Sequence, residues 1–434
     1  MSLRRAAPIL ALGALGALGA LGALAACGDA GGFSGDPFPV YLDRAAGAFV
    51  VTIRVGDGAP ETAVLDLLSP ITILDAPLGE APRRRRVELA LLGHRSPTDP
   101  ELITRARFSP SAIFLHPCDG EAPCTVGAPG APRPITAVIG ADTLRGDAIR
   151  FHPSEDRISV LPDIAGDSEA RARTCDAELP SPFYGGGTLV LGGTELGFSG
   201  LRIALNVCLS PDPLQADPAA RGIDSAMVLS SGIGPSIIGA ARYTAYATET
   251  GATPLESLPP ASVLLPSGVV EGRLARIAGI AIAATATSES PRGACREVYA
   301  QHLLSGRDCV EGDDCPCTEG TFCGAPAVIE LATSIEAIVV PDTHPLLQAL
   351  RAELRPSQPE IDGILGMSAL VSTELDVDYP GNRLLFRCAG AGCTVRPKLG
   401  DRAGRAVIAR CLLGAIPAID ARAVGINSDA RPVP

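Results

Sequence analysis

The 434-residue sequence lacks the recurrent motifs that identify several common enzyme classes. It contains no phosphate-binding loop and no dinucleotide fingerprint, and we therefore expect no cofactor. It also contains no G-x-S-x-G segment, so its serines show no sign of a nucleophile elbow. Histidine is scarce, and no two histidines have the i, i+4 spacing of a metal motif, so we expect no metal site. The five histidines are His94, His116, His152, His302 and His344.

Positive charge is also in short supply. The sequence has 36 Lys and Arg residues against 48 Asp and Glu residues. Removing Arg4 and Arg5 with the N-terminal leader described below leaves 34 basic residues against 48 acidic ones, a net charge of −14. An acidic balance of this size keeps a protein soluble and disfavours nucleic acid as a partner. The basic run Arg83–Arg86 departs from this balance, and we interpret it as a solvated loop in preference to a docking patch.

The apolar run from Ile9 to Ala26 is the one run of membrane length, and no second one follows it. Because Arg4 and Arg5 precede it, residues 1–26 have the charged and apolar regions of a secretory signal peptide. The run ends in Leu24-Ala25-Ala26-Cys27, which resembles the lipobox of bacterial lipoproteins. The alternative is a plain transmembrane anchor, since about 18 apolar residues just span a bilayer.

The lipobox resemblance implies cleavage before Cys27 and attachment of a lipid to its sulfur. The exported protein would then be tethered to a membrane of the cell envelope. Position 28 is Gly and not Asp, which by the same resemblance favours the outer membrane. Residues 27–37 have the glycine content of a flexible tether, and we expect the protein to be a monomer.

Cysteine usage agrees with export. Of the 13 cysteines, 12 remain once Cys27 is set aside, and an even number in an exported chain predicts disulfides. The pairs Cys118/Cys124 and Cys388/Cys393 are close enough in sequence to close short loops, although the connectivity stays open. Residues 288–324 form a Cys-rich insertion for which disulfides are favoured over a zinc site, because C-x-x-C spacing is absent. Its cysteines are Cys295, Cys309, Cys315, Cys317 and Cys323.

Short strand patterns separated by Gly and Pro dominate the rest of the chain. Phe49–Val55 is rich in β-branched residues and runs into the turn Gly56-Asp57-Gly58. Long helical periodicity is scarce, and residues 342–355 and 404–413 are the better candidates for helices. The exported part, of about 400 residues, exceeds the size of a single core, so two domains are expected.

An internal repeat organises those strands. Residues 139–160 align without gaps on residues 365–386 at an offset of 226, and each block reads as a strand ending in glycine, a short helix and a hairpin. Residues 64–74 align on residues 228–238 at an offset of 164. The order A–B–A′–B′ predicts a duplicated lobe.

Each repeat resembles a lobe of the aspartic peptidases, in which an apolar strand precedes a D-T/S-G turn and an apolar pair plus Gly follows later. The segment Ile361–Met367 is similar to that second element in pepsin-like and retropepsin-like enzymes, and Ala137–Asp142 is its first-lobe relative. The resemblance implies a mainly β, two-lobed fold with double-ψ β-barrel-type lobes and short helices. The lobes would cover residues 38–163 and 175–395, with a C-terminal extension at 396–434.

The resemblance also locates the family's catalytic positions. Aspartic peptidases use two carboxylates about 3 Å apart that share a proton, one from each lobe. Here Asp66 keeps the acid of lobe one but is followed by two leucines, whereas Ser230 takes the place of the second acid. The resemblance places Ser69, Ser231 and Gly232 in the binding cleft. A serine hydroxyl does not share the proton as a carboxylate does, so we expect no catalysis.

Two other hypotheses compete with this one. In the segment Asp224-Ser225-Ala226, which is similar to a D-S-G-type turn, Asp224 would supply the second acid of an active aspartic endopeptidase with Asp66. Against it, Ala226–Leu229 before Ser230 is a better buried strand than the residues before Asp224. The leading hypothesis is a non-catalytic protein that binds an extended peptide or an envelope protein in the interlobe cleft. A purely structural envelope lipoprotein is the third.

Overall fold

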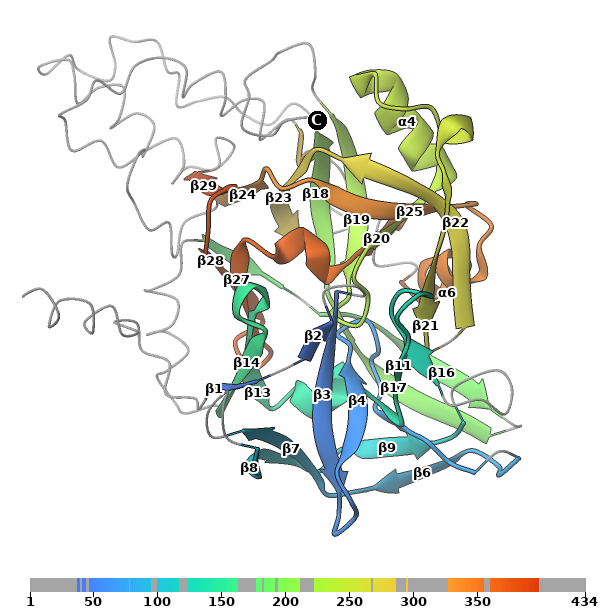
Figure 1. The fold of residues 1–434 in the computed structure, drawn as a ribbon, viewed down its shortest axis with the longest axis vertical. Helices are drawn as coiled ribbons and strands as arrows, with labels where there is room; N and C mark the ends of the chain where they lie inside the picture. Colours follow the sequence, from blue (N-terminus) through green and yellow to red (C-terminus); the bar gives the residue numbers. More distant parts are fainter. Residues whose placement is uncertain are drawn as a thin grey trace, which may run out of the picture.

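The computed structural model describes fourteen parts of the chain, which together form two β lobes joined by a third sheet (Figure 1). The architecture is mainly β, with two lobes and short helices, as the sequence predicts. None of the helices among the described residues has the length and hydropathy needed to cross a membrane. The described residues are 37–39, 41–43, 47–77, 79–94, 100–116, 124–162, 177–181, 183–191, 194–210, 222–266, 268–285, 294–295, 327–354 and 360–397.

Lobe one is built on a nine-stranded sheet whose inner face is filled with aliphatic side chains and the rings of Phe49 and Phe108. β2 (Tyr41–Asp43) pairs with β3, and the small hairpin β10 (Thr125–Val126) and β11 (Arg133–Pro134) lies beside the sheet. The other strands, in spatial order, are β6 (Arg83–Arg86), β9 (Ser111–Phe114), β5 (Ile73–Leu74), β12 (Ala137–Ile139), β4 (Glu61–Leu65), β3 (Ala48–Val55), β7 (Leu89–His94) and β8 (Leu102–Phe108).

Lobe two is built on a ten-stranded sheet. Before it the chain forms the hairpin β16 (Tyr184–Leu191) and β17 (Thr194–Arg202), which lies beside lobe one (Figure 1). The strands of lobe two, in spatial order, are β21 (Pro260–Leu265), β22 (Gly268–Ile277), β25 (Ile335–Val340), β20 (Ser236–Gly239), β26 (Gly363–Leu365), β19 (Ile223–Leu229), β18 (Ala204–Ser210), β23 (Gly279–Thr285), β24 (Ala327–Leu331) and β29 (Cys393–Pro397).

The two lobes repeat one another strand by strand. The order β6-β9-β5-β12-β4-β3-β7-β8 in lobe one corresponds to β22-β25-β20-β26-β19-β18-β23-β24 in lobe two. In the parallel pairs β4/β12 and β19/β26, Val64 lies opposite Val138 and Val228 lies opposite Ile364, which reproduces the offsets of 164 and 226. The duplication predicted from the sequence is therefore confirmed at the level of register.

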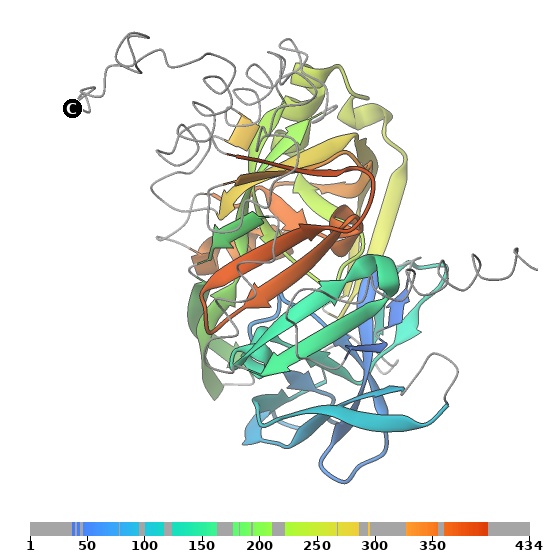
Figure 2. The same cartoon turned by 90° about the vertical axis from the view of Figure 1, so that its left-hand side faces the viewer.

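A six-stranded sheet joins the lobes, and its central antiparallel pair is contributed by one strand from each repeat (Figure 2). In this pair Arg150 lies opposite Asp376, and the two residues are separated by the repeat offset of 226. They therefore occupy equivalent positions beside the pseudo-twofold axis. The strands, in order, are β1 (Pro37–Pro39), β14 (Arg157–Pro162), β13 (Asp147–His152), β27 (Thr373–Asp378), β28 (Arg383–Cys388) and β15 (Ala177–Pro180).

The helices are short. α2 (Ala141–Leu144) and the 3₁₀ turn η3 (Met367–Leu370) occupy equivalent places after the glycine of each repeat. α6 (Pro345–Leu354) confirms the helix expected over 342–355, whereas the one expected over 404–413 lies outside the described residues. α4 (Ala240–Thr250) was not predicted, because only two of its side chains, both tyrosines, are buried.

One prediction about a local element was wrong. Arg83–Arg86 is not a loop but the edge strand β6, which pairs antiparallel with β9. All four arginine side chains are exposed, so the strand carries no apolar face that a sequence pattern would reveal. Backbone hydrogen bonds to β9 hold it in the sheet.

The structure also settles part of the disulfide pattern. Cys388 and Cys393 are bonded, as expected, and Cys208 is bonded to Cys295 across 87 residues of sequence. Cys124 is disulfide-bonded as well. Cys118, the remaining cysteines of the insertion and the lipidation candidate Cys27 lie outside the described residues.

Candidate functional site

Asp66 and Ser230 come together because each ends the same strand of its lobe. Asp66 follows β4, and its backbone N–H donates to the carbonyl of Ile139 at 3.0 Å. Ser230 follows β19 and makes the equivalent bond to Leu365 at 2.9 Å. The two turns therefore face each other across the pseudo-twofold axis. The Ser230 hydroxyl donates to Oδ1 of Asp66 at 2.7 Å.

Two backbone groups complete the environment of the Asp66 carboxyl group. Oδ1 also accepts from the N–H of Leu68 at 2.9 Å and from the N–H of Gly232 at 3.1 Å. A Cβ atom on Gly232 would lie 2.7 Å from Cγ of Asp66, so glycine is required for this close approach. Burial raises the pKa of Asp66, although its hydrogen bonds to Leu68, Ser230 and Gly232 work in the opposite direction.

A second serine links the two turns from one side only. The Ser231 hydroxyl accepts from the N–H of Leu67 at 3.0 Å and donates to the carbonyl of Leu65 at 2.8 Å. Ser231 thus makes two hydrogen bonds to lobe one from a fully buried position. Its equivalent at the offset of 164 is Leu67, which has no hydroxyl and makes no reciprocal pair. Hydroxyl hydrogen bonds between the two turns therefore run from lobe two to lobe one only.

A cavity of about 350 Å³ lies between the lobes above Asp66. Most of its wall is aliphatic, with side chains from both lobes. Leu68 lines this cavity and packs with a core cluster whose other members all come from lobe two. The lining residues are Asp66, Leu68, Ser69, Pro70, Ile73, Leu115, Val138, Arg202, Ile233, Leu265, Pro266, Leu346, Ala349, Leu350 and Glu353.

An ion pair forms the polar part of the cavity wall. The guanidinium of Arg202, at the end of β17, binds both carboxylate oxygens of Glu353 on α6 at 2.6 Å each. Arg202 also donates to the carbonyl of Leu68. Its charge lowers the pKa of Asp66, but less than burial raises it. No sequence signal pointed to this pair, because its members are 151 residues apart.

The three residues expected in the binding cleft have different positions. Ser69 is half-buried and lines the cavity, and its hydroxyl donates to the carbonyl of Ile71 at 2.7 Å. Ser231 and Gly232 do not line the cavity. They are buried in the junction between the lobes, where they contact the Asp66 turn.

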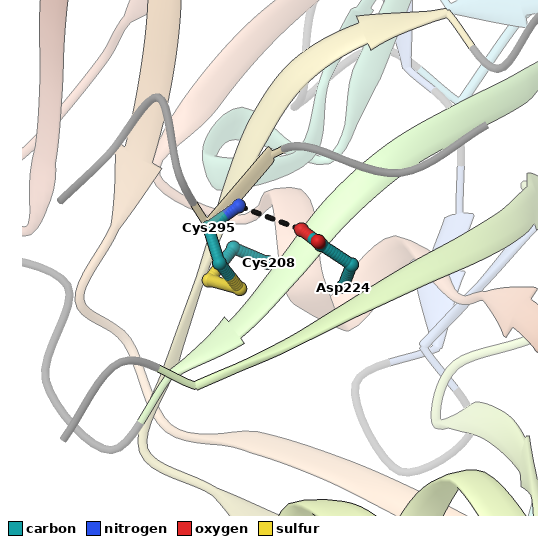
Figure 3. Close-up of a disulfide and its surroundings, with 3 residues drawn as sticks. All are labelled: Cys208, Asp224 and Cys295. Atoms are coloured by element: carbon teal, nitrogen blue, oxygen red, sulfur yellow. Dashed lines mark hydrogen bonds between the residues drawn. A yellow bond between two sulfur atoms is a disulfide. The ribbon is translucent and has the colours of Figure 1, made fainter. Parts of the chain in front are cut away.

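Asp224, the alternative second acid, does not face Asp66. It lies near the start of β19, six residues before Ser230, which is roughly 20 Å along a strand. Its Oδ1 accepts from the N–H of Cys295 at 2.7 Å, beside the Cys208–Cys295 disulfide (Figure 3). Asp224 therefore anchors the start of the Cys-rich insertion. The D-S-G-type resemblance at this position was misleading, since it falls within the strand and not at its end.

One group among the described residues has the donor atoms of a metal site. His152, Glu155 and Glu374 bring ligand atoms within 4.8 Å of one another. Glu374, however, already pairs with Arg387 at 3.4 Å and lies 3.9 Å from Arg150. These cations neutralise its charge, so the group suits an ion-pair network of the interlobe sheet better than a cation.

Comparison with known proteins adds little to this geometry. Searches against family models and against curated proteins found no match. Among solved structures, the chain is similar to an aspartic proteinase from Irpex lacteus, with 11% sequence identity and a TM-score of 0.36. The match covers 83% of this chain and 99% of that proteinase. The two-lobed, duplicated architecture is established by the strand correspondence between the lobes.

Proposed function

We propose that this protein is an exported, lipid-anchored and non-catalytic member of the aspartic-peptidase-like fold, and that it binds an extended peptide or an envelope protein partner in the interlobe cavity. The observation that carries the proposal is the 2.7 Å hydrogen bond between Asp66 and Ser230. A hydroxyl stands where proton sharing between two carboxylates requires an acid.

The surroundings of Asp66 support a non-catalytic role. An aspartic peptidase activates a water molecule between its two acids, and each acid is held by a hydroxyl from its turn. Here the lobe-one turn offers leucine at both following positions, and Leu68 fills space beside the carboxyl group. Burial raises the pKa of Asp66, so this carboxyl group stays protonated to a higher pH than an ordinary aspartate. Among the described residues it also has no second carboxylate facing it to share the general-base step.

The cavity supports a binding role. Its volume of about 350 Å³ is at the lower end for ligand sites, and its wall is mostly apolar with a few polar groups. Such a site accommodates one or two apolar side chains of a longer partner. The Arg202–Glu353 pair at the wall offers hydrogen bonds that orient a backbone. Lipid anchoring rests on the sequence around Cys27.

The catalytic part of the proposal is tested by acid-pH cleavage of an unfolded protein with the full chain, its Asp66→Asn variant and a statine-type inhibitor. We expect no cleavage above that of the Asp66→Asn variant. Turnover that is inhibited by statine and lost in Asp66→Asn would refute the non-catalytic assignment. If Asp224→Ala also removed activity while Ser230→Ala did not, the endopeptidase hypothesis would replace ours.

The binding part is tested with two alanines of α6 that are both exposed. Ala349 lines the cavity and Ala352 does not. In a peptide-array screen with the full chain, Ala349→Trp should remove bound peptides by filling the cavity, and Ala352→Trp should leave them bound. No peptide binding by the unmodified chain, or equal loss in both variants, would favour the purely structural role.

A further inference from the structure

A second cavity, of about 640 Å³, lies in lobe one between β6, the turn that precedes β9 and the turn between α2 and β13. It shares no lining residue with the interlobe cavity. Its charged lining residues are Arg84, Arg86, Arg107, Arg145, Asp142 and Asp147. Four cations and two acids thus surround one hollow in a chain whose net charge is −12.

The β geometry of the arginine run explains why only half of it reaches this cavity. Successive side chains of a strand point to opposite faces, so Arg84 and Arg86 share one face of β6. Arg83 faces the other way, pairs with Glu80 at 3.3 Å and lies over the Phe114 ring at 5.4 Å. Arg85 shares the face of Arg83 and does not line the cavity.

Most of the positive charge in the cavity has no counter-ion among the residues that the structure describes. Arg84 is held by neutral groups, the Ser111 hydroxyl at 2.9 Å and the Gly197 carbonyl at 2.8 Å. Among the described residues, none of Arg86, Arg107 and Arg145 has a carboxylate within ion-pair distance. These three arginines are exposed and line the cavity.

The two acids of the cavity offset this charge only in part. Asp142 accepts a hydrogen bond from the Thr72 hydroxyl at 2.7 Å, and burial raises its pKa. Asp142 therefore loses its charge at a higher pH than an ordinary aspartate does. Asp147 begins β13 at the rim. With both acids ionised, the lining carries two positive charges in excess.

We propose that this cavity, lined by Arg84, Arg86, Arg107 and Arg145, is a binding site for a phosphate-bearing anion. The guanidinium fork matches phosphate oxygens with two parallel hydrogen bonds. A phosphate monoester or a diphosphate carries about two or more negative charges, which balances the excess. A single carboxylate would leave half of that excess uncompensated. The volume accommodates a phosphate group together with part of the molecule that bears it.

The test uses the full chain in detergent micelles and two probes measured by calorimetry, inorganic pyrophosphate and phosphatidylglycerol dissolved in the same detergent, with phosphatidylcholine in that detergent as the neutral reference. The variants are Arg86→Gln, Arg107→Gln and Arg145→Gln, singly and combined. Arg85→Gln is the matched control, because it removes the same charge from the same strand on the opposite face. The interlobe peptide binding of each variant serves as the control for folding.

We expect each single variant in the cavity to weaken pyrophosphate binding about tenfold, the triple variant to abolish it, and Arg85→Gln to change it by less than about twofold. Binding of phosphatidylglycerol but not of phosphatidylcholine or pyrophosphate, with the same dependence on the three arginines, also supports the site and identifies the source as a lipid headgroup. Binding of neither probe, or equal loss in Arg85→Gln and the cavity variants, would overturn the proposal.

Discussion

The carboxyl group of Asp66 faces a hydroxyl group across the midline between the lobes. Its backbone N–H binds the carbonyl of Ile139, and its Oδ1 accepts from the N–H of Gly232 in the other lobe. Its side-chain partner there is Ser230, which donates one hydrogen bond and carries no charge. The carboxyl group is therefore governed by burial and not by a neighbouring anion, and its pKa is raised for that reason.

Replacing Asp66 with Asn should stabilise the protein at neutral pH. Because burial raises the pKa of Asp66 in the folded state, the folded protein holds this proton more tightly than the unfolded chain does. That contribution to stability is complete below about pH 4 and is lost as the pH rises through the folded pKa. The Asn oxygen accepts the same three hydrogen bonds.

The measurement is urea unfolding of both proteins between about pH 3 and pH 7. The stability difference should grow in favour of Asp66→Asn with rising pH. Asp57→Asn, in the exposed turn after β3, corrects for the change in overall charge. A constant difference across this range would contradict the assigned cause.

Removing the Ser231 hydroxyl should lower the free energy of unfolding more than removing the Ser69 hydroxyl from the cavity wall. Ser231→Ala leaves the buried N–H of Leu67 and carbonyl of Leu65 without this partner, at a cost of about 2–4 kcal/mol. Ser69→Ala, whose hydroxyl bonds within its own turn, should cost about 1 kcal/mol. Chemical denaturation of the two variants gives both values, and equal losses would show that Ser231 does not join the lobes energetically.

At the scale of elements, the start of β19 is fixed by covalent and polar contacts outside the cleft. The Cys208–Cys295 disulfide joins β18 to the Cys-rich insertion, and Asp224 binds the backbone of Cys295 (Figure 3). The disulfide and this hydrogen bond therefore attach one end of the β18–β19 pair to Cys295 of the insertion. The other end carries Ser230 at the midline, and the two ends have separate roles.

Loss of this disulfide should destabilise the protein more than loss of the short one. In the loop-entropy description, a bond that spans 87 residues contributes about 4–5 kcal/mol, and one that spans 5 residues contributes about 2 kcal/mol. We expect this order for the double variants Cys208→Ala/Cys295→Ala and Cys388→Ala/Cys393→Ala. Denaturant midpoints under non-reducing conditions measure it, and the reverse order would show that the insertion does not restrict the unfolded chain.

At the scale of the whole molecule, the lobes are joined by a buried ion pair beside the pseudo-twofold axis. Nε of Arg150 lies 2.6 Å from Oδ1 of Asp376, and a second nitrogen lies 3.0 Å from Oδ2. Burial raises the pKa of Asp376 to about 6, against the opposing effect of Arg150. An exact repeat would place two like residues here, so the sequence difference between the repeats is what permits the pair.

Replacing only the arginine of this pair should lower the stability of the protein strongly at neutral pH. Arg150→Met leaves a buried carboxylate without its countercharge, which typically costs about 3–5 kcal/mol. The folded-state pKa of Asp376 then rises further above its unfolded value, so the loss should be largest at pH 7 and smaller near pH 4. The double variant Arg150→Met/Asp376→Leu should regain most of the stability, as measured by urea unfolding. A double variant as unstable as the single one would show that the pair itself holds the lobes.

The sequence by itself determined the duplication, because the repeat offsets fixed which strands correspond and those offsets reappear in the register of both lobes. It also determined that position 230 lacks an acid, since the residue type at the end of a strand is local information. Spacing also named Cys388 and Cys393 as candidates for a short loop, and the structure shows that they are bonded. These features depend on pattern or on neighbours in the chain.

Only the tertiary structure decided which groups meet across long separations. It placed Asp224 beside Cys295 and not beside Asp66, it paired Arg202 with Glu353, and it turned an exposed arginine run into one wall of a cavity. Such contacts depend on how strands from different repeats curl together. The physical reason is that apolar packing and backbone pairing select the fold, and polar side chains far apart in sequence then meet as a consequence of it.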